Sequence, residues 1–260
     1  MKTYDIIVLG SGPGGYVTAI RASQLGFKTA IIEKENLGGV CLNWGCIPTK
    51  ALIKSAQVFD YLKNAKDFGL TIKGYDKDFN AVINRSRNVA SGMSKGVKFL
   101  MKKNKIDVIE GYGKIKSGKK VSVKKNDGKT SHLEAKNIII ATGAKSKVLP
   151  ILPQDGKKII GYREAMTIKS QPKKIIIIGS GAIGIEFAYF YNAMGSDVTI
   201  IEYLDRIVPV EDKDISSALE NNFKKHGIKI LTNSELIKSN IKNENVSVTI
   251  KTNDKEVVLK

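Results

Sequence analysis

Cys41 and Cys46 are the residues whose type and spacing could support chemistry most directly, and they are the only cysteines among 260 residues. On a regular helix, residues five positions apart have Cα atoms about 8–9 Å from each other. A disulfide needs Cα atoms closer than about 7 Å. A bridge between these two cysteines therefore requires a bent or unwound backbone, which the neighbouring Gly45 permits.

The residues after the pair favour a reactive thiol. Pro48 suits the first turn of a helix, and a thiol near a helix start has a lowered pKa and forms the reactive thiolate more easily. We therefore interpret the pair as a redox-active disulfide. Two alternatives remain open, inert core cysteines or half of a zinc site. Zinc usually takes four Cys or His ligands, and the only histidines, His132 and His226, are isolated along the chain, so we expect no metal.

Length and composition indicate an α/β protein of about two domains, with 42% hydrophobic residues and 24 glycines. Two cysteines are too few for a secreted disulfide scaffold, so a bridge here suits catalysis in a reducing compartment. An apolar strand already begins at residue 4, which leaves no room for a signal peptide. No apolar run approaches the roughly 20 residues that span a bilayer. We expect a soluble cytoplasmic protein without a membrane partner.

The formal net charge of +18 raises the question of a nucleic-acid partner. Lysine carries almost all of this charge and is spread along the chain, whereas the arginines are Arg21, Arg85, Arg87, Arg163 and Arg206. Arginine is the better residue for reading phosphates and bases. No basic cluster is interleaved with aromatic residues, so we expect no nucleic-acid function.

The first sixty residues hold a dinucleotide-binding pattern. A buried-type strand predicted at Tyr4–Leu9 runs into a glycine-rich loop, then a helix, and a second strand ends at Glu33. Gly10 suits a tight turn, Gly12 lets the backbone approach a pyrophosphate, and Gly15 lets the helix and strand pack closely. The helix N-terminus faces the phosphates, and Glu33 can bind a ribose hydroxyl. We also assign Gly14 and Lys34 to this site.

The same pattern returns in the second half of the chain. Five residues lie 169 positions after their counterparts in the first half, namely Gly179, Gly181, Gly184, Gly195 and Glu202. A second dinucleotide site is therefore predicted, and the dithiol lies between the two sites in sequence. Glu202 is followed by the neutral Tyr203, which favours a free 2′-hydroxyl and hence NAD, because a 2′-phosphate calls for an arginine.

Between and after these motifs the sequence predicts further elements. They are helices at 51–64, at 78–104 with Asp78 as the N-cap and at 214–226, an antiparallel meander at 107–133, and a buried strand at 137–141. The strand ends in Thr142 and Gly143, which suit either a second contact to the first nucleotide or a simple turn. Pro150 and Pro153 mark a boundary, which divides the chain into residues 1–149 and 150–260. We expect an α/β fold with two Rossmann-like domains built on parallel sheets, each with an antiparallel β-meander.

The arrangement of two nucleotide folds around a C-x4-C motif resembles the flavoprotein disulfide reductases. The stretches GGVCLNWGCIPTK, GSGPGGYVTAIRASQLG, ATGA and IEYLDRIVPVEDKDI resemble most closely the dihydrolipoamide dehydrogenase branch of that family. The resemblance covers the whole chain. It implies FAD in the first site, as the cofactor of residues 1–149, and NAD in the second. A related reductase of other disulfides or of mercuric ion, and a non-catalytic flavin-binding module, remain as alternatives.

The resemblance also implies residue roles. Cys41 would be the thiol that exchanges with dihydrolipoamide, and Cys46 the thiol next to the flavin. Lys50 would lie beside the flavin N5 and would pair with Glu186 near the nicotinamide. Without the resemblance, Lys50 is one more surface lysine and Glu186 a partly buried helix carboxylate.

Relatives in this branch are nearly twice as long, and the resemblance implies that their central and interface domains lie outside this chain. The interface domain supplies a His–Glu pair to the partner subunit's disulfide, and neither His132 nor His226 has that sequence context. The implied partners are a lipoyl domain of a 2-oxo acid dehydrogenase complex and, at full length, a second copy in a homodimer.

Overall fold

The computed structural model describes residues 1–242 and 245–260, and its internal contacts divide them into two units. Unit 1 comprises Met1–Pro48 and Ser86–Ser146, and unit 2 comprises Thr49–Arg85 and Lys147–Lys260. The predicted cofactor domains, 1–149 and 150–260, differ from these units chiefly in the segment 49–85. The assignment of domains to cofactors stays a prediction.

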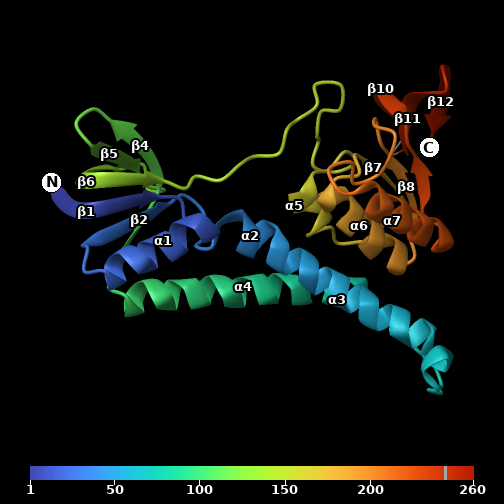
Figure 1. Ribbon diagram of the computed structural model, residues 1–260, viewed down its shortest axis with the longest axis horizontal. Helices are drawn as coiled ribbons and strands as arrows, with labels where there is room; N and C mark the ends of the chain where they lie inside the picture. The colour runs from blue at the N-terminus through green and yellow to red at the C-terminus, as the bar shows by residue number, and fades with distance from the viewer. Residues whose placement is uncertain (243–244) are drawn as a thin grey trace. The chain divides into compact units, whose positions relative to one another are not determined.

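Unit 1 is built on a six-stranded sheet with the order β3-β2-β1-β6-β5-β4 (Figure 1). The strands are β1 Lys2–Leu9, β2 Thr29–Glu33, β3 Asp107–Glu110, β4 Tyr112–Lys116, β5 Lys120–Lys124 and β6 Thr130–Ile140. Strand β1 runs parallel to both β2 and β6, and β2 runs parallel to β3. The remaining pairs, β4 with β5 and β5 with β6, are antiparallel.

Two predictions for this sheet need correction. The strand β3 is parallel to β2 and does not belong to the antiparallel meander, because the helix that precedes it carries the chain back across the sheet. The strand predicted at 137–141 is the second half of the longer β6, which pairs first with β5 and then with β1. It is also less buried than predicted, since Ile140 is 67% exposed.

Four α-helices and one short 3-10 helix precede β3. They are α1 Pro13–Gln24, α2 Gly39–Trp44, α3 Cys46–Lys63 and α4 Phe79–Lys103, and the short 3-10 helix η1 spans Ala65–Phe68. The predicted cap of α4 is confirmed, because the carboxylate of Asp78 accepts the N–H of Ala81 at 3.0 Å. Residues Val97 and Met101 of α4 pack with Ile31 of β2 in one core cluster, so this helix covers the sheet of unit 1.

Unit 2 contains a parallel sheet, β7-β8-β9, and an antiparallel sheet, β10-β11-β12. Its elements are α5 Tyr162–Ala165, β7 Lys174–Ile178, α6 Ala182–Ala193, β8 Asp197–Ile201, α7 Lys213–Lys225, β9 Lys229–Leu231, β10 Ser234–Lys242, β11 Asn245–Thr252 and β12 Lys255–Leu259. These elements confirm the second βαβ pattern and the meander that follows it.

Segment 49–85 belongs to unit 2 because of its apolar side chains. Leu52 of α3 and Phe79 of α4 share a core cluster with Phe190 and Tyr191 of α6. The ring centroid of Phe79 lies 6.0 Å from that of Phe190 and 6.4 Å from that of Tyr191. Aromatic pairs at this spacing bury large areas. No helix within the described residues is long and apolar enough to span a membrane.

Candidate functional site

The loop between β1 and α1 needs glycine at two of its positions for different reasons. Gly10 has φ +93°, in the region that favours glycine. A Cβ on Gly15 would lie 1.9 Å from the carbonyl oxygen of Gly10, so any side chain there would displace the helix from the turn. Gly12 and Gly14 differ, because a Cβ on either would meet no atom within 4 Å. The open space at the helix N-terminus fits a phosphate group.

The carboxylate of Glu33 is buried beside this loop and held in place by it. Its Oε2 accepts the backbone N–H of Ser11 at 2.9 Å and the hydroxyl of Ser11 at 2.6 Å. Its Oε1 accepts the N–H of Glu35 at 2.9 Å. A carboxylate has about four acceptor positions, so Glu33 retains capacity for a ribose hydroxyl. Together, Glu33 and the open space at Gly12 and Gly14 fit a dinucleotide.

The second loop repeats this geometry closely. Gly179 has φ +93°, and a Cβ on Gly184 would lie 2.2 Å from the carbonyl oxygen of Gly179. Glu202 accepts the N–H and the hydroxyl of Ser180 at 2.8 and 2.6 Å. A Cβ on Gly181 again meets no atom within 4 Å. The repeat of 169 residues therefore extends from sequence to hydrogen bonds, and the second loop also fits a dinucleotide.

The pKa of Glu202 results from opposing effects. Burial raises it, but the hydrogen bonds from the backbone of Leu204 and from Ser180 lower it by more. The pKa of Glu202 consequently lies below its ordinary value. The carboxylate is therefore charged at neutral pH and accepts hydrogen bonds only, as binding of a ribose hydroxyl requires.

The other residues assigned to the first site are distributed around the same loop. Ala141 donates its N–H to Leu9 at 2.8 Å, and a Cβ on Gly10 would lie 3.1 Å from Cα of Thr142. Thr142 therefore lies against the glycine loop, and Gly143 follows it with φ +69°. Lys34 is exposed directly after Glu33. Their contacts to a nucleotide stay predictions.

The bend expected between the cysteines is present. Helix α2 ends at Trp44, Gly45 adopts φ −144° and ψ −116°, and α3 begins at Cys46. A Cβ on Gly45 would lie 3.3 Å from Cα of Cys41, so the small residue lets the two cysteines approach each other. Both cysteines are free thiols in this structure.

Cys41 lies within α2 and not at a helix start, and its pKa is raised. Burial, and after it the neighbouring Cys46 thiol, raise the pKa of Cys41 to about 11. Cys41 therefore carries its proton at neutral pH while the pair is reduced.

The start of α2 packs directly on the first glycine loop, a contact that the sequence does not reveal. Gly38 donates its N–H to the carbonyl oxygen of Ser11 at 3.0 Å. A Cβ on Gly39 would lie 2.6 Å from Cα of Gly12. The only signal in the sequence is the pair of adjacent glycines, Gly38 and Gly39, both with positive φ. This contact brings the dithiol helix to the first dinucleotide loop.

Sequence reasoning also missed two residues that hold α2, Asn43 from within it and Arg87 from α4. The amide of Asn43 donates to the carbonyl oxygens of Leu37 and Gly39 at 2.9 and 3.0 Å. Arg87 of α4 donates from Nη2 to the carbonyl oxygen of Asn43 at 2.7 Å, and its Cζ lies 4.3 Å from the ring centroid of Trp44. No periodicity marks Arg87, because its partners lie on a different element.

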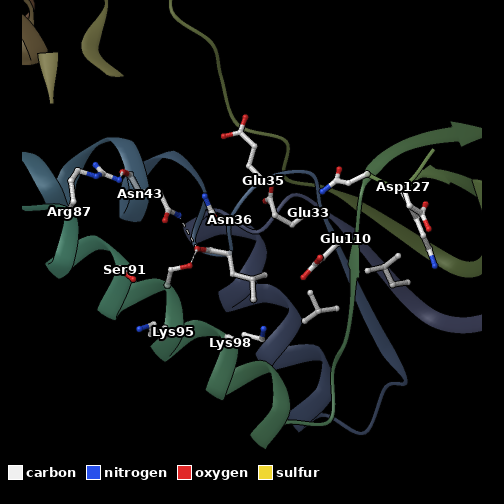
Figure 2. Close-up of a pocket in the computed structure, with 16 residues that line it drawn as sticks. Glu33, Glu35, Asn36, Asn43, Arg87, Ser91, Lys95, Lys98, Glu110 and Asp127 are labelled. Carbon is white, nitrogen blue, oxygen red and sulfur yellow. Dashed lines mark hydrogen bonds between the residues drawn. The ribbon is translucent and has the colours of Figure 1, made fainter. Parts of the chain in front are cut away.

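Figure 2 shows Arg87 and Asn43 at one end of a groove in unit 1. The groove has a volume of about 980 Å³ and runs between α4, the segment after β2 and the strand β3. Lys95 and Lys98 line it from α4, and Glu33 and Glu110 line it from the sheet. Burial lowers the pKa of Arg87 from its ordinary value, but arginine remains charged at neutral pH.

Lys50 and Glu186 form an ion pair within unit 2, between α3 and α6. This is the pairing that the resemblance implies, and the catalytic roles of both residues stay predictions. Among the residues that the structure describes, no group of three or more His, Cys, Asp and Glu side chains could hold a metal ion.

These features define a class of protein, with two glycine-loop dinucleotide folds of which the first adjoins a pair of thiols. The family model described as pyridine nucleotide-disulphide oxidoreductase matches residues 4–259. The chain belongs to that family.

Individual relatives agree with this placement. A dihydrolipoyl dehydrogenase of Rhizobium etli is 48% identical over 271 residues, which cover 98% of this chain and 56% of that protein. One of Zymomonas mobilis is 50% identical over 233 residues, 90% of this chain and 50% of that protein. The crystal structure of LpdA from Mycobacterium tuberculosis matches with a TM-score of 0.89 at 27% identity, over 99% of this chain and 57% of that one. The chain thus spans about half the length of the curated relatives it matches.

Proposed function

We propose that this chain is the FAD- and NAD-binding part of a dihydrolipoamide dehydrogenase, which passes electrons from dihydrolipoamide through the Cys41–Cys46 disulfide and FAD to NAD⁺. The observation that carries the proposal is the contact of Gly39 with Gly12, because it seats the dithiol helix on the first dinucleotide loop. The second loop, which otherwise repeats the first, has no thiol near it in sequence.

The chain's own residues account for the thiol chemistry. A substrate thiolate attacks Sγ of Cys41, the bond between the two cysteines breaks, and Cys46 leaves as a thiolate. The second substrate thiol then displaces Cys41 from the mixed disulfide, so that substrate is oxidised by two electrons and the cysteine pair is reduced by two. The protons of the substrate thiols pass to the cysteines or to solvent.

The residues around the glycine loops bind and orient the nucleotides. Gly12 and Gly14 leave room for the pyrophosphate, and Glu33 accepts a ribose hydroxyl in the first site. When bound, FAD would supply the two-electron redox chemistry between the dithiol and NAD⁺. Glu202 accepts a ribose hydroxyl of NAD in the second site, and Lys50 and Glu186 fix each other's position.

The partners follow from the same proposal. The substrate would be the dihydrolipoyl group on a lipoyl domain of a 2-oxo acid dehydrogenase complex, and the full-length protein would be a homodimer in the cytoplasm. The names of the relatives support the enzyme class and leave the particular complex open.

The visible absorption spectrum of the purified chain, before and after two-electron reduction, tests the proposal. We expect flavin bands and, on reduction, a long-wavelength band from a thiolate in contact with the flavin. Replacement Cys46→Ser should remove the long-wavelength band and leave the flavin bands. A non-catalytic flavin module would give the same spectra with and without Cys46. Preference for NADP over NAD would instead indicate a related disulfide or mercuric reductase.

A further inference from the structure

The segment between the two cysteines is held by a cation from a distant element. Arg87 of α4 donates from Nη2 to the carbonyl oxygen of Asn43 at 2.7 Å, and its guanidinium lies over the ring of Trp44. Asn43 and Trp44 are the last two residues of α2 and precede the bend at Gly45. Arg87 therefore holds the stretch of backbone that links the two cysteines.

The guanidinium of Arg87 is well suited to bind the C-terminal end of α2. The last carbonyl groups of a helix lack partners within it and attract cations. A planar guanidinium can donate in its plane to one of these carbonyls while its face stacks on an aromatic ring. A lysine would reproduce the charge but neither the planar stack nor the fork of donors.

Arg87 also has a spare donor. Its Nη1 is buried and has no hydrogen-bond partner among the described residues. An unpaired buried donor is costly to a fold. Asn43 and Arg87 both line the groove of about 980 Å³.

We propose that Arg87 is a positioning residue for the dithiol–disulfide cycle, which holds Asn43 and Trp44 so that Cys41 and Cys46 stay within bonding reach. Formation of the S–S bond in turn changes the contact between Arg87 and Trp44. This inference rests on the proposed function, because it assumes that the two cysteines cycle.

The direction in which Arg87 should shift the equilibrium between dithiol and disulfide follows from the entropy of closing a loop. When the pair closes, each thiol loses a proton, one S–S bond forms, and two electrons pass to an oxidant such as oxidised dithiothreitol, which becomes the dithiol. A segment that is already held loses little freedom in this step, whereas a free segment loses more. Removal of Arg87 should therefore shift the equilibrium towards the two thiols.

The test compares Arg87→Met, Arg87→Lys and a matched control, Arg85→Met. Arg85 lies on the same helix but donates to the carbonyl oxygen of Ala51 and the hydroxyl of Ser55, away from the segment between the cysteines. Each chain is equilibrated anaerobically in dithiothreitol redox buffers, trapped by alkylation and analysed by mass spectrometry. We expect the disulfide-to-dithiol ratio in a given buffer to fall at least fivefold in Arg87→Met, by less in Arg87→Lys, and less than twofold in Arg85→Met.

A second measurement uses the wild-type chain and Arg87→Lys. Trp44 is the only tryptophan in the chain, so its fluorescence reports on the contact with Arg87 without an added label. We expect the emission of the wild-type chain to differ between the dithiol and disulfide states. The difference between the two states should be smaller in Arg87→Lys, which tests the inference even if Arg87→Met does not fold.

Two results would overturn the role of Arg87 but not the proposed function. One is a disulfide-to-dithiol ratio in both Arg87 variants within twofold of wild type. The other is a wild-type tryptophan emission that is the same in both redox states. In either case the wild-type disulfide still forms and the proposed function stands. A wild-type chain that forms no Cys41–Cys46 disulfide in any buffer overturns both.

Discussion

At the scale of single residues, Cys41 shows how surroundings set reactivity. It lies within α2, where partial burial and the adjacent Cys46 raise its pKa to about 11. In the reduced state the protonated form thus predominates at neutral pH. The proposed chemistry is consistent with this, because Cys41 is attacked as part of a disulfide and has no need to act as a thiolate in that step.

The raised pKa of Cys41 predicts a steep pH dependence of alkylation. Only the thiolate reacts, so the rate of Cys41 modification by iodoacetamide in the reduced chain should rise about tenfold per pH unit between pH 7 and 10. Site-resolved mass spectrometry measures this rate. Replacement Cys46→Ser removes one cause of the raised pKa, so Cys41 should then react faster at pH 8. A rate that levels off near pH 8 in the wild-type chain would contradict the structure.

Glu202 predicts a pH-dependent contribution to stability. Its pKa in the folded state lies below the ordinary value of 4.5, so its stabilising contribution is present above that pH and is lost as the pH falls through the folded pKa. We expect Glu202→Gln to lower the free energy of unfolding by about 2 kcal/mol at pH 7, through its hydrogen bonds to a charged group.

The difference between Glu202→Gln and wild type should shrink below pH 4 in urea unfolding experiments. The exposed Glu211 provides a control, because Glu211→Gln should leave the free energy of unfolding within about 0.5 kcal/mol of wild type. If the effect of Glu202→Gln on the free energy of unfolding grew on acidification, the pKa of Glu202 would not be lowered in the folded state.

At the scale of elements, the glycine loops combine two kinds of constraint. Gly15 is required by the fold, because a Cβ would lie 1.9 Å from the carbonyl oxygen of Gly10. Gly14 is not, because its Cβ would have free space. The corresponding position in the second loop is occupied by Ile183, whose side chain is 60% exposed. The space at Gly14 therefore distinguishes the first site from the second.

This contrast predicts different outcomes for two similar substitutions. Gly15→Ala should lower the free energy of unfolding by about 3 kcal/mol or more through steric overlap. Gly14→Ala should leave it unchanged or raise it by up to about 1 kcal/mol, because alanine favours a helix. It should nevertheless weaken FAD binding at least tenfold if the phosphates occupy this space. Urea unfolding and flavin fluorescence titration measure the two effects, and normal FAD affinity in Gly14→Ala would contradict this role for the space.

At the scale of the whole molecule, the proposed function requires electrons to pass from the thiol pair to a nicotinamide. The ion pair of Lys50 and Glu186 joins α3, which begins at Cys46, to the helix of the second glycine loop. The pair is partly exposed, so it contributes at most about 1 kcal/mol to stability. Its importance is therefore expected in catalysis.

We accordingly expect Lys50→Met to change the free energy of unfolding by less than about 1 kcal/mol and to slow reduction of the bound flavin by NADH at least tenfold. Stopped-flow absorbance measures the rate. Lys54, which contacts Gln57 on the same helix, supplies the matched control Lys54→Met. Equal rates for the two variants would show that Lys50 is an ordinary surface lysine.

Much of the fold could be predicted because its signals are local. The two glycine patterns, the acidic residues that follow them, the cap at Asp78 and the bend at Gly45 each depend on residues close in sequence. The parallel placement of β3, the partial burial of Cys41 and the membership of segment 49–85 in unit 2 could not, because each depends on contacts between elements far apart along the chain.

The sequence by itself determined that the chain carries two dinucleotide loops and a thiol pair that can close only across a bent backbone, since side-chain type and φ/ψ freedom set those features. Only the tertiary structure decided that the thiol pair lies at the first loop, through the contact of Gly39 with Gly12. It alone placed Arg87 on the backbone between the cysteines. The physical reason is that close packing of distant elements selects these partners, and no local pattern encodes them.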